Sequence, residues 1–186
     1  MSRVKASTVL TRFDYLSKVY GPRAKERFLA ELSESSRKQI TGLVLPQAWV
    51  PFELYVEVNE TIDRLFGKGD LALCVEVSKY AAEANLPTLY KVFYRLSSVA
   101  FIMKKAASLW NVHYDSGTLV VKDVDRSHAL LTIRGFEPPH KTLCFGFRGW
   151  AARAIELSGG RHVYHDEAHC RIDKGGQDCD FRFEWD

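Results

Sequence analysis

The sequence contains no long apolar run, and this absence limits the kinds of protein that it can encode. No stretch of its 186 residues approaches the roughly 18 consecutive apolar residues that predict a membrane span. The first residues also lack the apolar core of about 7 to 15 residues, with a small-residue cleavage site, that marks an export signal. We therefore expect a cytoplasmic protein without a membrane span.

An excess of charge of one sign is also missing. Lys and Arg number 26 and Asp and Glu number 23, which leaves a net charge of +3 without any block of five like charges. This balance gives no reason to expect a nucleic-acid partner. Hydrophobic residues make up 46% and charged residues 26%, values typical of a globular chain and not of a disordered one. The length suits a single domain over residues 1–186.

Helical periodicity dominates residues 1–110. Apolar residues recur three and four positions apart in segments that end at glycine or proline. Ser33 and Ser36 are suited to cap a short helix that ends at Gly42. The expected helical segments are 9–21, 22–44 with a break near Ser33, 52–67, 70–86, and two buried or interface helices within the nearly apolar stretch 87–110.

The pattern changes to alternation after Trp110. Strands are expected over 112–124 and 127–136, and a second pair over 162–173 and 178–186. A helix over 141–160 separates the two pairs, and the glycine turn 174–176 joins the last two strands. The predicted class is α+β, in which an N-terminal helical layer (1–110) packs on a four-stranded antiparallel sheet in a β-β-α-β-β unit (111–186).

Three of the four cysteines gather near the C-terminus together with one glutamate. Cys144 lies near the start of a predicted helix, and Cys170 and Cys179 flank the final turn. Strand pairing about that turn would place these two thiols opposite each other, roughly 5 Å apart. A tetrahedral zinc ion takes four ligands, and three thiolates with one carboxylate satisfy it. Cys144, Glu167, Cys170 and Cys179 are therefore candidate ligands of a closed, structural site.

Two alternatives to this set remain open. Glu167 and Cys170 have opposite strand parity, so a bulge or kink must lie between them if both bind the metal. His169 could replace Glu167 as a ligand. Without any metal, Cys144 would be a small buried hydrophobe, and Cys170 and Cys179 would be a reduced cross-strand pair or a disulfide.

The spacing of these residues resembles a known site. In this chain 22 residues separate Cys144 from Glu167, two separate Glu167 from Cys170, and eight separate Cys170 from Cys179. The pattern is similar to the zinc site of the vinyl-reductase-like (4-vinyl reductase) sensory domain of aromatic-responsive bacterial transcription activators. Their last interval is one residue shorter, which puts Cys179 in doubt as a ligand. The runs LCFGFRGWAARAIELSGGRH and CRIDKGGQDCDFRFEW also look like the end of that domain.

A second resemblance covers residues 3–185. GDLALCVEVSKYAAE, LPTLYKVFYRL and LWNVHYDSG are similar to an uncharacterised paralogous family of myxobacterial proteins. That family belongs to the ligand-binding fold shared with haem-nitric-oxide-binding domains and a Golgi trafficking subunit. The resemblance implies a homodimer with an apolar cavity between helices and sheet. We expect a structural zinc ion at the cysteine cluster, and a ligand that is a small apolar or aromatic molecule or a lipid in the cavity.

Haem is not expected in this chain. The haem-binding relatives require an axial histidine and a Tyr-x-Ser-x-Arg signature, and here the run from Tyr114 to Thr118 lacks the arginine. Aromatic side chains could line an apolar pocket, although such a stripe is also typical of a filled core. The candidate pocket residues are Tyr90, Phe93, Trp110, His113 and Tyr114.

No catalytic motif is present. The chain has no Gly-x-Ser-x-Gly, no His-Glu-x-x-His and no phosphate-binding glycine loop. We therefore predict no catalytic residues and a non-catalytic sensory or ligand-binding module that signals through an unidentified partner. The alternative is a structural adaptor of the same fold, with a filled core, that assembles through residues 87–110.

Overall fold

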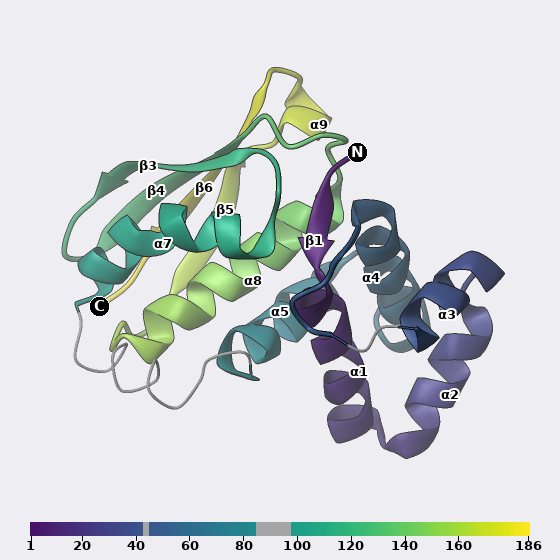
Figure 1. Ribbon diagram of the computed structural model, residues 1–186. Coiled ribbons are helices and arrows are strands. Elements are labelled where there is room, and N and C mark those ends of the chain that lie inside the picture. Colours follow the sequence, from purple (N-terminus) through teal and green to yellow (C-terminus); the bar gives the residue numbers. More distant parts are fainter. Residues whose placement is uncertain (43–44, 85–97) are drawn as a thin grey trace.

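The computed structural model describes residues 1–42, 45–84 and 98–186, and helices make up most of its first part (Figure 1). The structure confirms each helix that the sequence predicts in the described part of this region. The predicted first helix of the stretch 87–110 lies mostly outside the described residues. The helices are α1 (Ala6–Tyr20), α2 (Pro22–Glu31), α3 (Glu34–Thr41), α4 (Phe52–Phe66), α5 (Ala72–Ala84) and α7 (Val99–His113).

The C-terminal part forms the predicted β-β-α-β-β unit, so the α+β class is confirmed. The four strands pair antiparallel in the order β3-β4-β6-β5. Each edge strand contains a bulge, between Val121 and Asp123 in β3 and between Glu167 and His169 in β5. The elements are β3 (Thr118–Val124), β4 (His128–Arg134), α8 (Lys141–Leu157), β5 (Tyr164–His169), α9 (Arg171–Lys174) and β6 (Asp178–Glu184).

Two local predictions were wrong. The expected strand over 112–124 begins only at Thr118, because α7 continues to His113 and the indole of Trp110 donates a hydrogen bond to the carbonyl of Ser116 at 3.0 Å. The last two strands do not meet in a simple hairpin, because the short helix α9 precedes Gly175 and Gly176. Both glycines have positive φ, so the chain still turns where the glycines predict it.

A two-stranded sheet that the sequence did not predict joins the N-terminus to the helices. It pairs β1 (Arg3–Lys5) with β2 (Trp49–Pro51) antiparallel. The ammonium group of Lys5 lies 3.7 Å from the centre of the Trp49 ring. Strands of three residues are too short for an alternating pattern to stand out, so only the tertiary pairing defines them.

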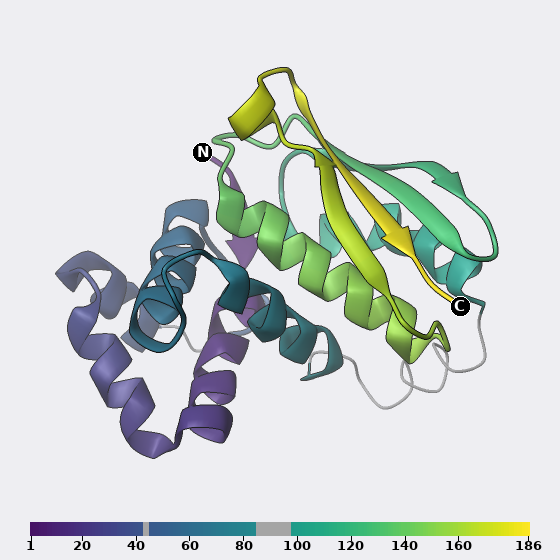
Figure 2. The ribbon, with the colours of Figure 1, turned by 180° about the vertical axis from the view of Figure 1, so that it is seen from behind.

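Helix α8 lies between the sheet and the N-terminal helices, and α7 covers the same side of the sheet as α8 (Figures 1 and 2). The face of β6 that meets α8 is apolar, since Cys179, Phe181 and Phe183 are buried. The opposite face carries ion pairs between neighbouring strands, such as Arg182 with Asp166 at 2.9 Å. Side chains therefore alternate along β6 between a buried apolar face and a charged face.

The contact between α5 and α8 is unusually close. A Cβ atom on Gly149 of α8 would lie 2.1 Å from the carbonyl oxygen of Val75 on α5. One turn earlier, a Cβ on Gly146 would lie 2.3 Å from the hydroxyl of Tyr55. Glycine at position 149 lets α8 approach the backbone of α5, and glycine at position 146 leaves room for the Tyr55 side chain of α4.

A carboxylate on α4 secures the start of α3. Glu57 accepts hydrogen bonds from the backbone N–H and hydroxyl of Ser33 and from the hydroxyl of Ser36. Burial alone raises the pKa of Glu57, but the hydrogen bonds from the two serines outweigh it and lower the pKa below the usual 4.5. The contribution of the ionised form to stability is thus complete above pH 4.5 and is lost as the pH falls through the folded-state value.

We expect Glu57→Gln to lower the free energy of unfolding by about 1 kcal/mol at pH 7, the usual scale of a lost cap. The difference from wild type should shrink as the pH falls below 4.5, which urea unfolding at pH 7 and pH 4 measures. Glu53→Gln, on the exposed side of the same helix, is the control and should change stability by less than about 0.5 kcal/mol. A loss at Glu57 that is equal at both pH values would contradict the role of the charge.

Candidate metal cluster and ligand pocket

The structure brings the four predicted metal ligands together from three parts of the chain. Cys144 lies in the first turn of α8, Glu167 in β5, Cys170 between β5 and α9, and Cys179 in β6. One ligand atom from each residue lies within 4.8 Å of the others. The three thiols are buried and unbridged, so the disulfide alternative does not describe this structure.

The spacing of the donors suits a tetrahedral ion. The sulfurs of Cys144 and Cys179 lie 3.9 Å apart, and two thiolates at about 2.3 Å from a tetrahedral zinc are ~3.8 Å apart. Glu167 Oε1 is buried and has no hydrogen-bond partner among the described residues. A buried carboxylate oxygen without a donor is costly, and a metal ion would relieve that cost. The donor set therefore fits a zinc ion.

The bulge in β5 resolves the parity of Glu167 and Cys170. Glu167 pairs with Phe181 and His169 with Asp180, so Ala168 is the extra residue on this strand. The bulge is the irregularity that ligation by both residues requires. His169, the alternative ligand, lies outside the cluster, and its Nε2 is 3.0 Å from the carbonyl oxygen of Gly175.

Hydrogen bonds already favour negative charge on part of the cluster. The thiol of Cys144 donates to Cys179, which raises the pKa of Cys144 and lowers the pKa of Cys179 to about 7. Burial and a hydrogen bond to Glu167 raise the pKa of Cys170 to about 11, although the backbone N–H groups of Ile172 and Asp173 act in the opposite direction. A metal ion would replace the remaining thiol protons.

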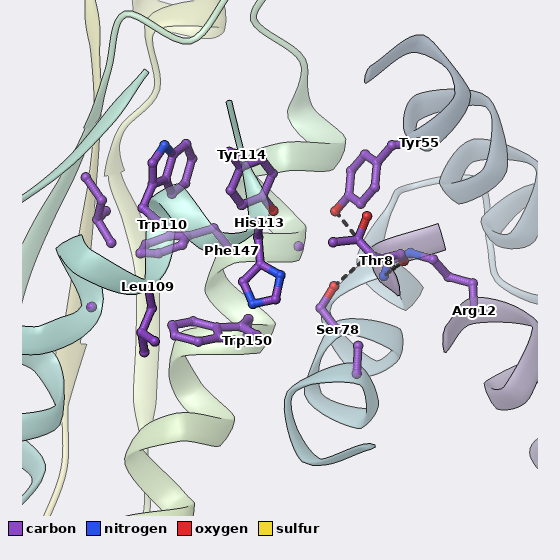
Figure 3. A pocket seen from close by; sticks show the side chains of 14 residues that line it. Thr8, Arg12, Tyr55, Ser78, Leu109, Trp110, His113, Tyr114, Phe147 and Trp150 are labelled. Carbon is purple, nitrogen blue, oxygen red and sulfur yellow. Dashed lines mark hydrogen bonds between the residues drawn. The ribbon is translucent and has the colours of Figure 1, made fainter. Parts of the chain in front are cut away.

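A pocket lies between the N-terminal helices and the pair α7 and α8 (Figure 3). It offers about 50 Å³ of space for the centres of water molecules, which is room for roughly three to five waters. Among the described lining residues, Leu119 alone comes from the sheet, so this part of the pocket lies mainly between helices. The lining residues are Thr8, Arg12, Tyr55, Ser78, Ala81, Ala106, Leu109, Trp110, His113, Tyr114, Leu119, Gly146, Phe147 and Trp150.

One wall of the pocket is aromatic. Trp110 stacks on Tyr114 with ring centres 4.2 Å apart, and Phe147 meets Trp110 edge to face. His113 extends between this wall and the opposite one in Figure 3. Its Nδ1 is buried without a hydrogen-bond partner among the described residues, and burial lowers the pKa of His113, so the ring is neutral at pH 7.

The opposite wall is polar and is centred on Arg12 of α1. The guanidinium donates to Asn59 at 3.0 Å, to the hydroxyl of Tyr55 at 3.1 Å, to the hydroxyl of Ser78 at 3.3 Å and to the carbonyl of Thr8. It also lies over the Tyr55 ring, 4.7 Å from the ring centre. Arg12 is only 2% exposed.

The predicted pocket residues are thus partly accounted for. Trp110, His113 and Tyr114 line the pocket, whereas Tyr90 and Phe93 lie outside the described residues. The predicted residues come from one wall, and sequence reasoning missed the polar wall entirely. A signal for that wall existed, since Arg12 interrupts the buried stripe of α1.

The fold of the chain is that of H-NOX domains. One solved structure with this fold is an oxygen-binding H-NOX domain related to soluble guanylate cyclases, in its oxygen complex. It is 11% identical, with a TM-score of 0.69 over 97% of this chain and 94% of that one. A Cs H-NOX variant carrying 4-cyano-L-phenylalanine is 11% identical, with a TM-score of 0.71 over 97% and 96%. An unliganded Fe(II) H-NOX protein from K. algicida is 10% identical, with a TM-score of 0.68 over 98% and 96%.

These likenesses support the haem-nitric-oxide-binding-like fold that the sequence resembles. The resemblances to the vinyl-reductase-like domain and to the myxobacterial family stay predictions. No protein family and no curated protein matches the sequence. Within the described ranges, no helix has the length and apolar character that crossing a bilayer requires.

The pocket does not fit a haem. Its volume of about 50 Å³ is far below the roughly 300 to 1,000 Å³ of pockets that enclose larger ligands. His113 has a buried ring nitrogen without a hydrogen-bond partner among the described residues, and the side chain of Trp150 lies close below it in Figure 3. Thr118, where the haem signature has arginine, is an exposed residue at the start of β3.

Proposed function

We propose that this chain is a non-catalytic sensory domain that binds a small apolar or aromatic molecule in the pocket between its helix layers. The observation that carries the proposal is the pocket itself, with Trp110 and Phe147 on one wall and Arg12 on the other. Residues 1–186 act as one ligand-binding domain in this proposal. Binding of the ligand in the pocket changes a surface that a second copy of the chain or a signalling partner contacts.

We also propose that Cys144, Glu167, Cys170 and Cys179 hold a structural zinc ion. Four protein ligands leave no open coordination position, so the ion would tie α8 to the ends of β5 and β6 and would not bind substrate. The convergence of the four donors and the buried, unpartnered Oε1 of Glu167 support this assignment.

Native mass spectrometry of the purified chain, with a parallel metal assay, tests both proposals. The expected result is one zinc per chain in a dimer, with a further small mass from a bound organic molecule. A species free of both metal and ligand, which also takes up neither when zinc and small aromatic molecules are added, would contradict the sensory proposal.

One observation favours a structural adaptor as the second candidate. Two apolar side chains of α7 face solvent, since Phe101 is 41% and Val112 is 52% exposed. Exposed apolar groups on one helix suit a protein contact. An adaptor would associate through α7 whether or not the pocket is filled, so Val112→Asp would abolish association without changing ligand binding.

A further inference from the structure

Arg12 is a buried cation that no carboxylate neutralises. Its hydrogen-bond acceptors are an amide, two hydroxyls and a backbone carbonyl, all neutral groups. No ion pair joins it to any Asp or Glu of the described residues. Residues 43–44 and 85–97 contain no Asp or Glu, so the rest of the sequence cannot supply a carboxylate partner either.

The ionisable groups around Arg12 do not balance its charge. Burial raises the pKa of Tyr55 and of Tyr114, and it raises the pKa of Cys74 to about 12, so all three are neutral at pH 7. Asp63 is the buried carboxylate of α4, and it accepts the backbone N–H groups of Leu71 and Leu73. A buried charge without a counter-charge keeps an uncompensated desolvation cost even when neutral groups accept its hydrogen bonds. An anion in the adjacent cavity would offset that cost.

We propose that the pocket binds a small monocarboxylate, with its carboxylate at Arg12 and its apolar part against Trp110, Phe147 and Trp150. This inference rests on the proposed function and names the chemical class of its ligand. Guanidinium is suited to the task because its planar fork matches the two oxygens of a carboxylate.

The other polar groups of the pocket support the same class of ligand. Ser78 and Tyr55 each accept a hydrogen bond from Arg12. The Tyr55 hydroxyl also has hydrogen bonds with Ser78 and Tyr114, so the three hydroxyls form one network beside the guanidinium. An anion at Arg12 could accept from this network after the hydroxyl groups rotate. The unpartnered Nδ1 of His113 adds a further polar contact. The polar wall thus holds one cation and several donors and lacks a carboxylate.

The size of the cavity limits the ligand. Space of about 50 Å³ corresponds to roughly three to five water positions, which is comparable to the five heavy atoms of propionate. A benzene ring needs a cavity nearer ~150 Å³, so benzoate would have to displace part of the wall. We therefore expect propionate to bind without rearrangement and benzoate to bind only if the aromatic wall moves.

Isothermal titration calorimetry with two matched pairs of probes tests the inference on the full chain as purified. Propionate is compared with propionamide, and benzoate with benzamide, because each pair differs in charge but hardly in shape. We expect the acid of at least one pair to bind about tenfold or more tightly than its amide, the scale of one charge-assisted hydrogen bond. Arg12→Gln should abolish that preference, and Arg12→Lys should keep part of it. Arg64→Gln, an exposed arginine on α4, is the control and should leave the preference unchanged.

The outcomes separate this inference from the proposed function. Amides that bind wild type as tightly as the acids would overturn the carboxylate assignment and leave the ligand-binding proposal standing. Failure of all four probes to bind would overturn the carboxylate assignment and count against the pocket as a site for small molecules. The comparison of acid and amide in wild type stands even if Arg12→Gln does not fold.

Discussion

Removing the metal from the cysteine cluster is expected to lower the free energy of unfolding by about 4 kcal/mol, the linkage expected when free zinc is about 1,000 times its dissociation constant. The ion would join the first turn of α8 to the ends of β5 and β6, elements that carry much of the apolar core. Thermal unfolding before and after treatment with a chelator measures the loss, and added zinc should restore the original midpoint.

Cysteine variants make the same prediction site by site. Cys144→Ser and Cys170→Ser should each remove most of the stabilisation by the metal, so the double variant should cost much less than the sum of the two. Cys74→Ser is the matched control, because Cys74 is a buried thiol of α5 outside the cluster. It should keep the full response to chelator. Small, additive losses that do not depend on the chelator would indicate thiols that only fill space.

Gly149→Ala is expected to lower the free energy of unfolding by about 3 kcal/mol, at the upper end of overpacking changes. The added Cβ would meet the backbone carbonyl of Val75 at 2.1 Å, and a helix backbone cannot move aside as a flexible side chain can. The higher helix propensity of alanine returns at most about 1 kcal/mol. Urea unfolding measures the difference, which should appear in the transition midpoint with an unchanged slope.

Gly42→Ala is the matched control for this substitution. Gly42 ends α3 with an ordinary right-handed backbone, and a Cβ there would lie 3.4 Å from the carbonyl oxygen of Lys38. Alanine at this position should leave stability unchanged or raise it by up to about 1 kcal/mol. A Gly149→Ala variant as stable as the Gly42→Ala variant would mean that α5 and α8 separate at little cost.

Local signals predicted most of the fold because they coincide with strong physical constraints. The hydroxyl of Ser33 caps α3 as expected, and alternation along β6 places Phe181 and Phe183 in the core. The end of α7 was misplaced because residues 112–117 alternate in polarity, which is typical of a strand. In the structure Trp110 donates a hydrogen bond to the carbonyl of Ser116, and Tyr114 pairs with Val4 in an isolated β-bridge. A contact between residues 110 positions apart leaves no trace in a local pattern.

The two candidate sites differed in how far the sequence could predict them. Thiols and carboxylates are typical metal ligands, and their spacing in the sequence indicated a metal site. The cluster that includes Cys144 and Cys179 could therefore be predicted before its geometry was known. The polar wall of the pocket could not, because Arg12, Tyr55 and Ser78 come from three helices with no shared motif. Arg12 is a candidate binding residue only because it is buried beside the pocket, and its burial depends on the packing of those helices.

The bulges in the two edge strands also determine how the sheet meets its surroundings. An edge strand presents unpaired N–H and C=O groups that could template a strand from another molecule. In β3 the pairing slips between Val121 and Asp123, and in β5 it slips between Glu167 and His169, so neither edge offers an even row of these groups. The sheet therefore resists extension from either side, and copies of this chain are expected to associate through their helices and not by continuing the sheet.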